Sequence, residues 1–130
     1  MIFNDEKIIK LLKDAPNSSA VKIFFFIAAN QPKDGLHGFR TTKEFIAGEL
    51  NIKRTAVFDA IKYLKSEILI QEIKFVEDSD FMVNPYFVMN NSDFNERKNE
   101  WNRRQRLDID REQRLRHERY LREARKTKNQ

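Results

Sequence analysis

Few residues of this chain are suited to covalent or metal chemistry. It contains no cysteine, and its two histidines, His37 and His117, lie far apart in the sequence. A zinc centre built from cysteine and histidine therefore lacks ligands. Tyr63, Tyr86 and Tyr120 are conceivable nucleophiles for nicking DNA, yet no His-x-His metal motif accompanies them. A glycine-rich phosphate loop is also absent, so the sequence predicts no enzyme, no cofactor and no metal site.

A different chemistry is indicated between Thr41 and Leu64, where polar side chains flank an apolar helical face. Arginine can bond guanine through two atoms, and threonine can bond a phosphate or a base edge. An aromatic ring can contact the thymine methyl group, and a carboxylate can accept a hydrogen bond from the amino group of cytosine. These side-chain types occupy the outward positions of a predicted helix that begins at Lys53 or Arg54. The predicted DNA-contacting residues of this region are Thr42, Lys53, Arg54, Thr55, Phe58, Asp59 and Lys62.

Two helices joined by a tight turn must position these side chains. Thr41 and Glu44 fit a capping box that begins the first helix, and Ala47 is small enough to let the helices cross closely. Asn51 tolerates the left-handed conformation that turns the chain, and Ile52 adds an apolar contact inside the turn. The second helix would then project its N-terminal half into a major groove. Its inward side chains are predicted to be Val57, Ile61 and Leu64.

The neighbouring elements complete the order helix, helix, strand, helix, turn, helix, hairpin. One helix is predicted to start after Asn4, and an almost wholly apolar helix to run from Ala20 to about Asn30. A short strand is expected at residues 39–40, and a hairpin from residues 71–76 and 81–83. The loop at 77–80 holds the acids Glu77, Asp78 and Asp80, which predicts a tip that avoids phosphates and meets a basic surface instead. This fold is mainly α with a small β-hairpin wing, a winged helix-turn-helix.

The charge divides the chain after Phe94. Residues 1–94 hold 12 Lys and Arg against 13 Asp and Glu, whereas residues 95–130 hold 13 against 7. We therefore predict a winged-helix domain at 1–94, followed by a basic tail at 95–130 that is helical or partly disordered. Such a tail is either a cationic arm that lies along phosphates or a solvated charged helix. Its candidate phosphate contacts are Arg103, Arg104, Arg106, Arg111 and Arg114.

Three motifs carry a resemblance to a known family: VKIFFFI, the run TTKEFIAGELNIKRTAVFDAIKYL from Thr41 to Leu64, and FMVNPYFVMNN from Phe81 to Asn91. From residue 39 to residue 91 the chain resembles the small winged-helix plasmid replication proteins of the RepL type. The resemblance implies a plasmid-encoded protein that binds its own origin in replication initiation or copy control. The resemblance does not extend to the tail. The Asn84-Pro85 pair has an alternative interpretation, in which its role is only to end a strand and direct the chain onward.

The sequence thus favours a sequence-specific binder of double-stranded DNA. Two alternatives stay open, a transcriptional repressor and a winged-helix module that docks a partner protein through its tail. A homodimer and host replication proteins are further partners that we consider. The longest apolar run, residues 23–29, is far shorter than the ~20 residues that span a bilayer. No signal peptide is evident, so the sequence predicts a cytoplasmic protein without a membrane partner.

Overall fold

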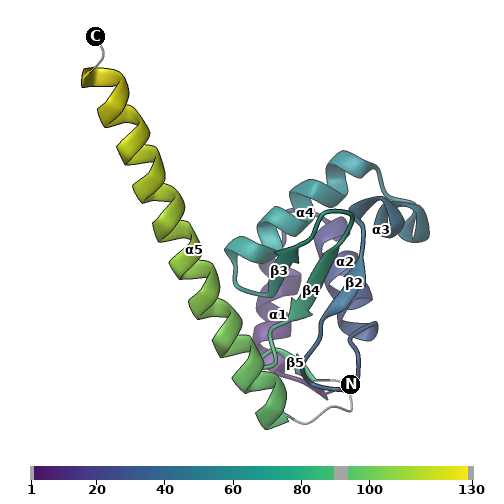
Figure 1. Cartoon of the computed structure of the whole chain (residues 1–130). Coiled ribbons are helices and arrows are strands. Elements are labelled where there is room, and N and C mark those ends of the chain that lie inside the picture. Colours follow the sequence, from purple (N-terminus) through teal and green to yellow (C-terminus); the bar gives the residue numbers. More distant parts are fainter. Residues whose placement is uncertain (1, 90–93, 129–130) are drawn as a thin grey trace.

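The chain folds into a mainly helical body from which one long helix projects (Figure 1). This computed structural model describes residues 2–89 and 94–128, and within them all side chains other than those of 2, 108–117, 127 and 128. In chain order the elements are β1 (Ile2–Phe3), α1 (Asp5–Asp14), α2 (Ser18–Ala29), β2 (Phe39–Thr41), α3 (Lys43–Leu50), α4 (Arg54–Ser66), β3 (Ile70–Lys74), β4 (Ser79–Val83), β5 (Val88–Met89) and α5 (Phe94–Lys128).

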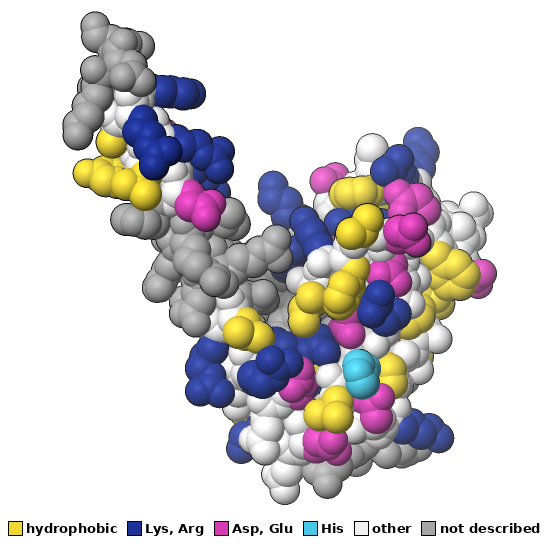
Figure 2. Space-filling model, viewed as in Figure 1, with side chains coloured by type: hydrophobic (Ala, Val, Ile, Leu, Met, Phe, Trp, Pro, Cys, Tyr) yellow, Lys and Arg dark blue, Asp and Glu magenta, His cyan; other side chains and the backbone are white. Residues whose placement is uncertain are grey.

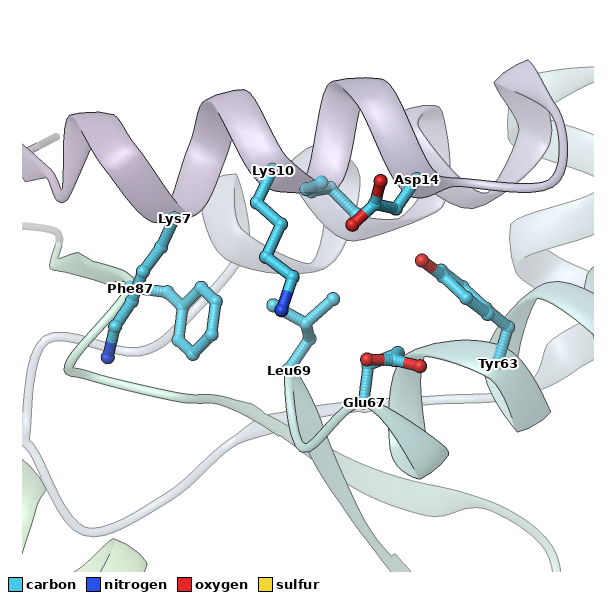
Figure 3. A pocket seen from close by; sticks show the side chains of 8 residues that line it. Lys7, Lys10, Asp14, Tyr63, Glu67, Leu69 and Phe87 are labelled. Atoms are coloured by element: carbon cyan, nitrogen blue, oxygen red, sulfur yellow. The ribbon is translucent and has the colours of Figure 1, made fainter.

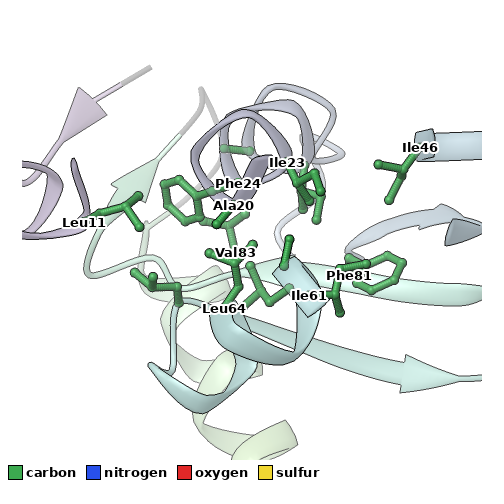
Figure 4. Close-up of a cluster of buried hydrophobic side chains, with 14 of the residues drawn as sticks. Leu11, Ala20, Ile23, Phe24, Ile46, Ile61, Leu64, Phe81 and Val83 are labelled. Atoms are coloured by element: carbon green, nitrogen blue, oxygen red, sulfur yellow. The ribbon is translucent and has the colours of Figure 1, made fainter. Parts of the chain in front are cut away.

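Asparagine side chains cap the first two helices, at Asn4 as predicted and at Asn17, so that α2 begins at Ser18, two residues before the predicted Ala20. Asn4 Oδ1 accepts from the backbone N–H of Lys7 at 3.2 Å, and Asn17 Oδ1 accepts from that of Ala20 at 3.2 Å. Each bond satisfies an amide that has no partner inside its helix. The apolar helix α2 lies in the centre of the core, as expected of a helix that is apolar on nearly all sides. The core side chains labelled in Figure 4 are Leu11, Ala20, Ile23, Phe24, Ile46, Ile61, Leu64, Phe81 and Val83.

The turn between α3 and α4 has the predicted geometry. Asn51 adopts the left-handed conformation, with φ 52° and ψ 49°, and its backbone N–H bonds to Ala47 O. Ile52 packs against the core, and the predicted inward residues of α4 are all buried. Because left-handed backbone costs asparagine little, the chain reverses here within three residues, 51–53, between the two helices.

The predicted cap of α3 is wrong by one residue. Thr42 Oγ1, and not Thr41, accepts from the backbone N–H of Phe45 at 3.0 Å. Thr41 is buried at the end of β2, where it pairs with Ser79 of β4. The pairing of these two strands holds Thr41 in extended backbone, so the helix can begin only after the next residue.

In the described part of the chain, β2, β4 and β3 form an antiparallel sheet with β4 in its centre. The expected hairpin is present, but Ser79 and Asp80 belong to β4 and not to the connecting turn. Since side chains alternate along a strand, Phe81 and Val83 face α2 and α4, whereas Asp80 and Met82 face the other side. All four side chains are buried, so both faces of β4 are covered.

The second face of the sheet is covered by the first turns of α5. The side chain of Trp101 is only 1% exposed, and its backbone oxygen accepts from Gln71 Nε2 of β3 at 2.9 Å. Arg97 and Arg104 are buried as well. The packed body therefore extends beyond Phe94, where the charge pattern placed its end. The later turns of α5 leave the body, as Figure 1 shows in yellow-green and yellow.

Asn84 has a structural role. Its side-chain Nδ2 donates to Ile68 O at 2.9 Å, and its Oδ1 accepts from the backbone N–H of Tyr86 at 2.9 Å. These bonds join the end of β4 to the connection between α4 and β3. The Asn84-Pro85 pair thus directs the chain away from the sheet.

Candidate nucleic-acid interface

The structure gathers the predicted contact residues on the outer face of α4. The side chains of Val57, Ala60, Ile61 and Leu64 are buried on the opposite face. Those of Lys53, Arg54, Thr55, Phe58, Asp59 and Lys62 are all exposed. Thr42 lies at the neighbouring start of α3, half-buried, with its Oγ1 engaged in the cap. One helical face therefore displays three cations, a hydroxyl, an aromatic ring and a carboxylate.

Phe58 is the centre of a small cation–aromatic cluster. Lys43 Nζ lies 4.5 Å from the centre of its ring, and Arg54 Cζ lies 5.3 Å from it. Both distances are within the range of a cation–π attraction. Arg54 also pairs with Glu44, with 2.9 Å between Nη2 and Oε1. Lys43 and Glu44 were not predicted to belong to this face, although their position at the start of α3 was a usable signal.

A buried carboxylate lies beneath this face. The Glu72 side chain is 1% exposed, and its oxygens lie 3.5 Å from Lys43 Nζ and 3.1 Å from Lys65 Nζ. It also accepts from Ser79 Oγ at 2.7 Å. Burial alone would raise the pKa of Glu72, but the hydrogen bonds from Ser79 and Lys65 and the charges of both lysines outweigh it and lower that pKa. Glu72 therefore stays ionised and neutralises part of the charge of these lysines.

The turn between β3 and β4 is both acidic and apolar. Arg40 of β2 donates to both oxygens of Asp78, at 3.2 and 2.7 Å, and its Cζ lies 4.0 Å from the ring centre of Phe75. Val76 is fully exposed. The prediction that Asp80 lies at this tip is wrong, because Asp80 belongs to β4. The exposed apolar pair Phe75 and Val76 was not predicted. Their position directly before the acids of the turn was the signal that could have assigned Phe75 and Val76 to the tip.

The predicted tail contacts fall into three groups. Arg103 and Arg106 are exposed, although Arg103 Nε donates to Glu100 at 2.9 Å. Arg104 is buried against Asp80 and Glu100, so the structure contradicts its assignment as a phosphate contact. This pairing could not be predicted from the sequence, because the partner Asp80 lies on the distant strand β4. Arg111 and Arg114 lie outside the residues whose side chains the structure describes.

A concave site lies between α1 and the C-terminal end of α4 (Figure 3). Its lining residues are Lys7, Lys10, Leu11, Asp14, Tyr63, Glu67, Leu69 and Phe87. Burial raises the pKa of the Tyr63 phenol, and the charges of Glu67 and Asp14 raise it further. A phenol that is harder to ionise is a poorer nucleophile. Within the described residues, no group of three His, Asp or Glu side chains is arranged to hold a metal ion.

The comparisons with known proteins found no relative. No family model matches the chain, and no curated protein or solved structure matches it. Among the described residues, no helix is both long and apolar enough to cross a membrane.

Proposed function

We propose that this chain binds double-stranded DNA as a winged helix-turn-helix protein, with α4 as the recognition helix. The observation that carries the proposal is the exposed face of α4 and its N-cap, which displays Lys53, Arg54, Thr55, Phe58 and Lys62 and on which Arg54 lies against the Phe58 ring. Arginine, lysine and threonine are side chains that contact base edges and phosphates in a major groove. The tight turn at Asn51 lets this end of α4 protrude from the body.

The N-terminal end of α4 also suits a phosphate. No described side chain caps it, since Lys53 makes no capping hydrogen bond. The first backbone N–H groups of the helix therefore point outward without an intrahelical partner, at the positive end of the helix dipole. In this proposal the β3–β4 hairpin is the wing. Its acids Glu77 and Asp78 make the tip unsuited to phosphate contact.

Sequence-independent attraction in this proposal comes from α5. Figure 2 shows dark-blue Lys and Arg side chains gathered along the projecting part of this helix. The exposed arginines among the described side chains of α5 are Arg103, Arg106, Arg119, Arg122 and Arg125. Cations spaced along a helix can follow phosphates and release counterions from DNA.

Within DNA binding, we propose that the protein binds a plasmid replication origin for initiation or copy control, in the cytoplasm. The support is the resemblance of residues 39–91 to RepL-type proteins. Footprinting of purified protein on plasmid and genomic fragments tests this role. Protection of a repeat at an origin supports replication, whereas protection of promoters alone supports a transcriptional repressor. Absence of any protection opposes DNA binding altogether.

A protein-docking role is the second candidate, and exposed apolar side chains on α5 favour it. Leu107, Tyr120 and Leu121 lie beyond the packed part of the helix, and their apolar side chains are therefore exposed. In this case the chain protects no DNA, and the projecting part of α5 binds a protein partner or a second copy of the chain.

A further inference from the structure

The two cations beside Phe58 are each held by an acid of the protein itself. Lys43 lies 3.5 Å from Glu72, and Arg54 lies 2.9 Å from Glu44. Among the ion pairs of the described residues, Lys53 and Lys62 take part in none. Of the four cations Lys43, Lys53, Arg54 and Lys62, two are thus already paired with an acid of the protein in the absence of DNA.

The two acids differ in how firmly they are fixed. Glu72 is buried, and Lys65 and Ser79 hold it together with Lys43, so it belongs to the fold. The Glu44 side chain is 57% exposed, and that of its partner Arg54 is 67% exposed. An ion pair between two exposed side chains is weak and is readily broken by a better partner. Arg54 can therefore leave Glu44 for DNA, whereas Lys43 stays matched.

We infer that Glu44 is a specificity-determining residue, which restrains Arg54 and so disfavours binding to random DNA more than binding to the correct site. This inference rests on the proposed function. On random DNA, Arg54 would exchange a carboxylate for a phosphate, and the released Glu44 charge would be left near the DNA backbone. On a correct site, the two hydrogen bonds from Arg54 to a guanine offset the loss of its ion pair with Glu44.

The position of Glu44 strengthens this effect. It lies in the first turn of α3, next to the exposed N-terminal end of α4 that Arg54 occupies. A duplex that engages Arg54 must therefore approach the Glu44 carboxylate as well. Repulsion between that carboxylate and phosphates is weakened by salt, over a Debye length of about 10 Å at 0.1 M.

The test compares Glu44→Gln with Glu49→Gln in the full chain. Glu49 is an exposed acid of the same helix that takes part in none of the ion pairs of the described residues. Both variants lose one negative charge, but only Glu44→Gln releases Arg54. Binding is measured on a duplex selected from a random pool and on a scrambled duplex of equal length, at low and moderate salt.

We expect Glu44→Gln to tighten binding to the scrambled duplex by about threefold to tenfold and binding to the selected duplex by less. The ratio of the two affinities falls, and the change shrinks as salt rises. Glu49→Gln should shift both affinities equally. In an Arg54→Ala background, Glu44→Gln should no longer change the ratio.

Three results distinguish failure of this inference from failure of the proposed function. An unchanged ratio in Glu44→Gln, with DNA binding intact, overturns the inference and leaves the proposed function standing. Equal effects of the two variants would mean that net charge alone is responsible, which overturns it as well. If the unsubstituted chain binds neither duplex, the proposed function and this inference fall together.

Discussion

Arg104 of α5 forms a buried ion pair with Asp80 of β4, with 2.7 Å between Nη1 and Oδ1 and both side chains 5% exposed. The same carboxylate accepts from the backbone N–H of Gly38 at 3.1 Å, and Arg104 Nη2 donates to Leu36 O at 2.8 Å. A side chain at position 38 would collide with Asp80 and the Phe81 backbone, so only glycine allows this approach. The pair therefore joins the base of α5, the central strand and the loop before β2.

We expect Asp80→Asn to destabilise the fold strongly. The substitution leaves the buried Arg104 charge with Glu100 as its remaining carboxylate partner, so the loss should approach the cost of breaking a buried ion pair, about 3–5 kcal/mol. Urea unfolding followed by circular dichroism measures the loss. Asp78→Asn is the matched control, since its ion pair with Arg40 is partly exposed, with the Arg40 side chain 51% and the Asp78 side chain 30% exposed, and should be worth no more than about 1 kcal/mol. Equal losses in the two variants would contradict the structural role of the Asp80–Arg104 pair.

Asp34 should titrate well below an ordinary aspartate. Its pKa is lowered from 3.8 to about 2, first by the hydrogen bond from the backbone N–H of His37 and further by the His37 side chain and the N–H of Leu36. Since the folded pKa is depressed, the stabilisation is present above pH 3.8 and is lost as the pH falls toward 2. Carboxyl chemical shifts of the folded chain locate the midpoint.

His37→Ala provides the comparison for Asp34. It removes the side-chain contact but keeps the backbone hydrogen bonds, so the pKa of Asp34 should rise only part of the way toward its ordinary value. A midpoint near 3.8 in the unsubstituted chain would disprove the depressed pKa.

Replacement of Arg54 and Lys62 by alanine should weaken DNA binding without unfolding the chain, since both side chains are exposed on α4. Each side chain that reads a base or a phosphate contributes roughly 1–3 kcal/mol. Fluorescence anisotropy on a selected duplex measures the loss, and Lys13→Ala with Lys22→Ala serves as a charge-matched control on α1 and α2. Unchanged binding in the Arg54 and Lys62 double variant would exclude α4 as the recognition helix.

The projecting arginines of α5 should govern the salt dependence of binding. Replacement of Arg119, Arg122 and Arg125 by glutamine removes three exposed cations and leaves the packed first turns of the helix intact. Each phosphate contact contributes a slope of about −0.9 on a log–log salt plot, so the slope should flatten by up to about 2.7 on duplex DNA. Glutamine at Lys10, Lys13 and Lys22 is the control. Coincident slopes for all three proteins would favour a protein partner for this helix.

Local chemistry was sufficient to predict most helices and the turn between α3 and α4. Asn4 and Asn17 cap their helices through bonds to residues three positions on, and Asn51 turns the chain through its own backbone preference. The outward face of α4 also followed from the sequence, because helical spacing assigns the apolar residues to one side. These interactions lie within a few residues, so the order of side chains determines them.

Contacts between segments far apart in the sequence decided the features that the sequence did not predict. Whether Thr41 or Thr42 caps α3 depends on a strand pairing with Ser79. Whether Arg104 meets solvent or Asp80 depends on how α5 packs across the sheet. Charge counting assigned Arg104 to a solvated tail, and the polar run at 77–80 assigned Asp80 to a turn, because neither pattern carries information about which charges meet. The low dielectric of a shared interior made that pairing favourable, and it exists only once β4, the loop before β2 and α5 have come together.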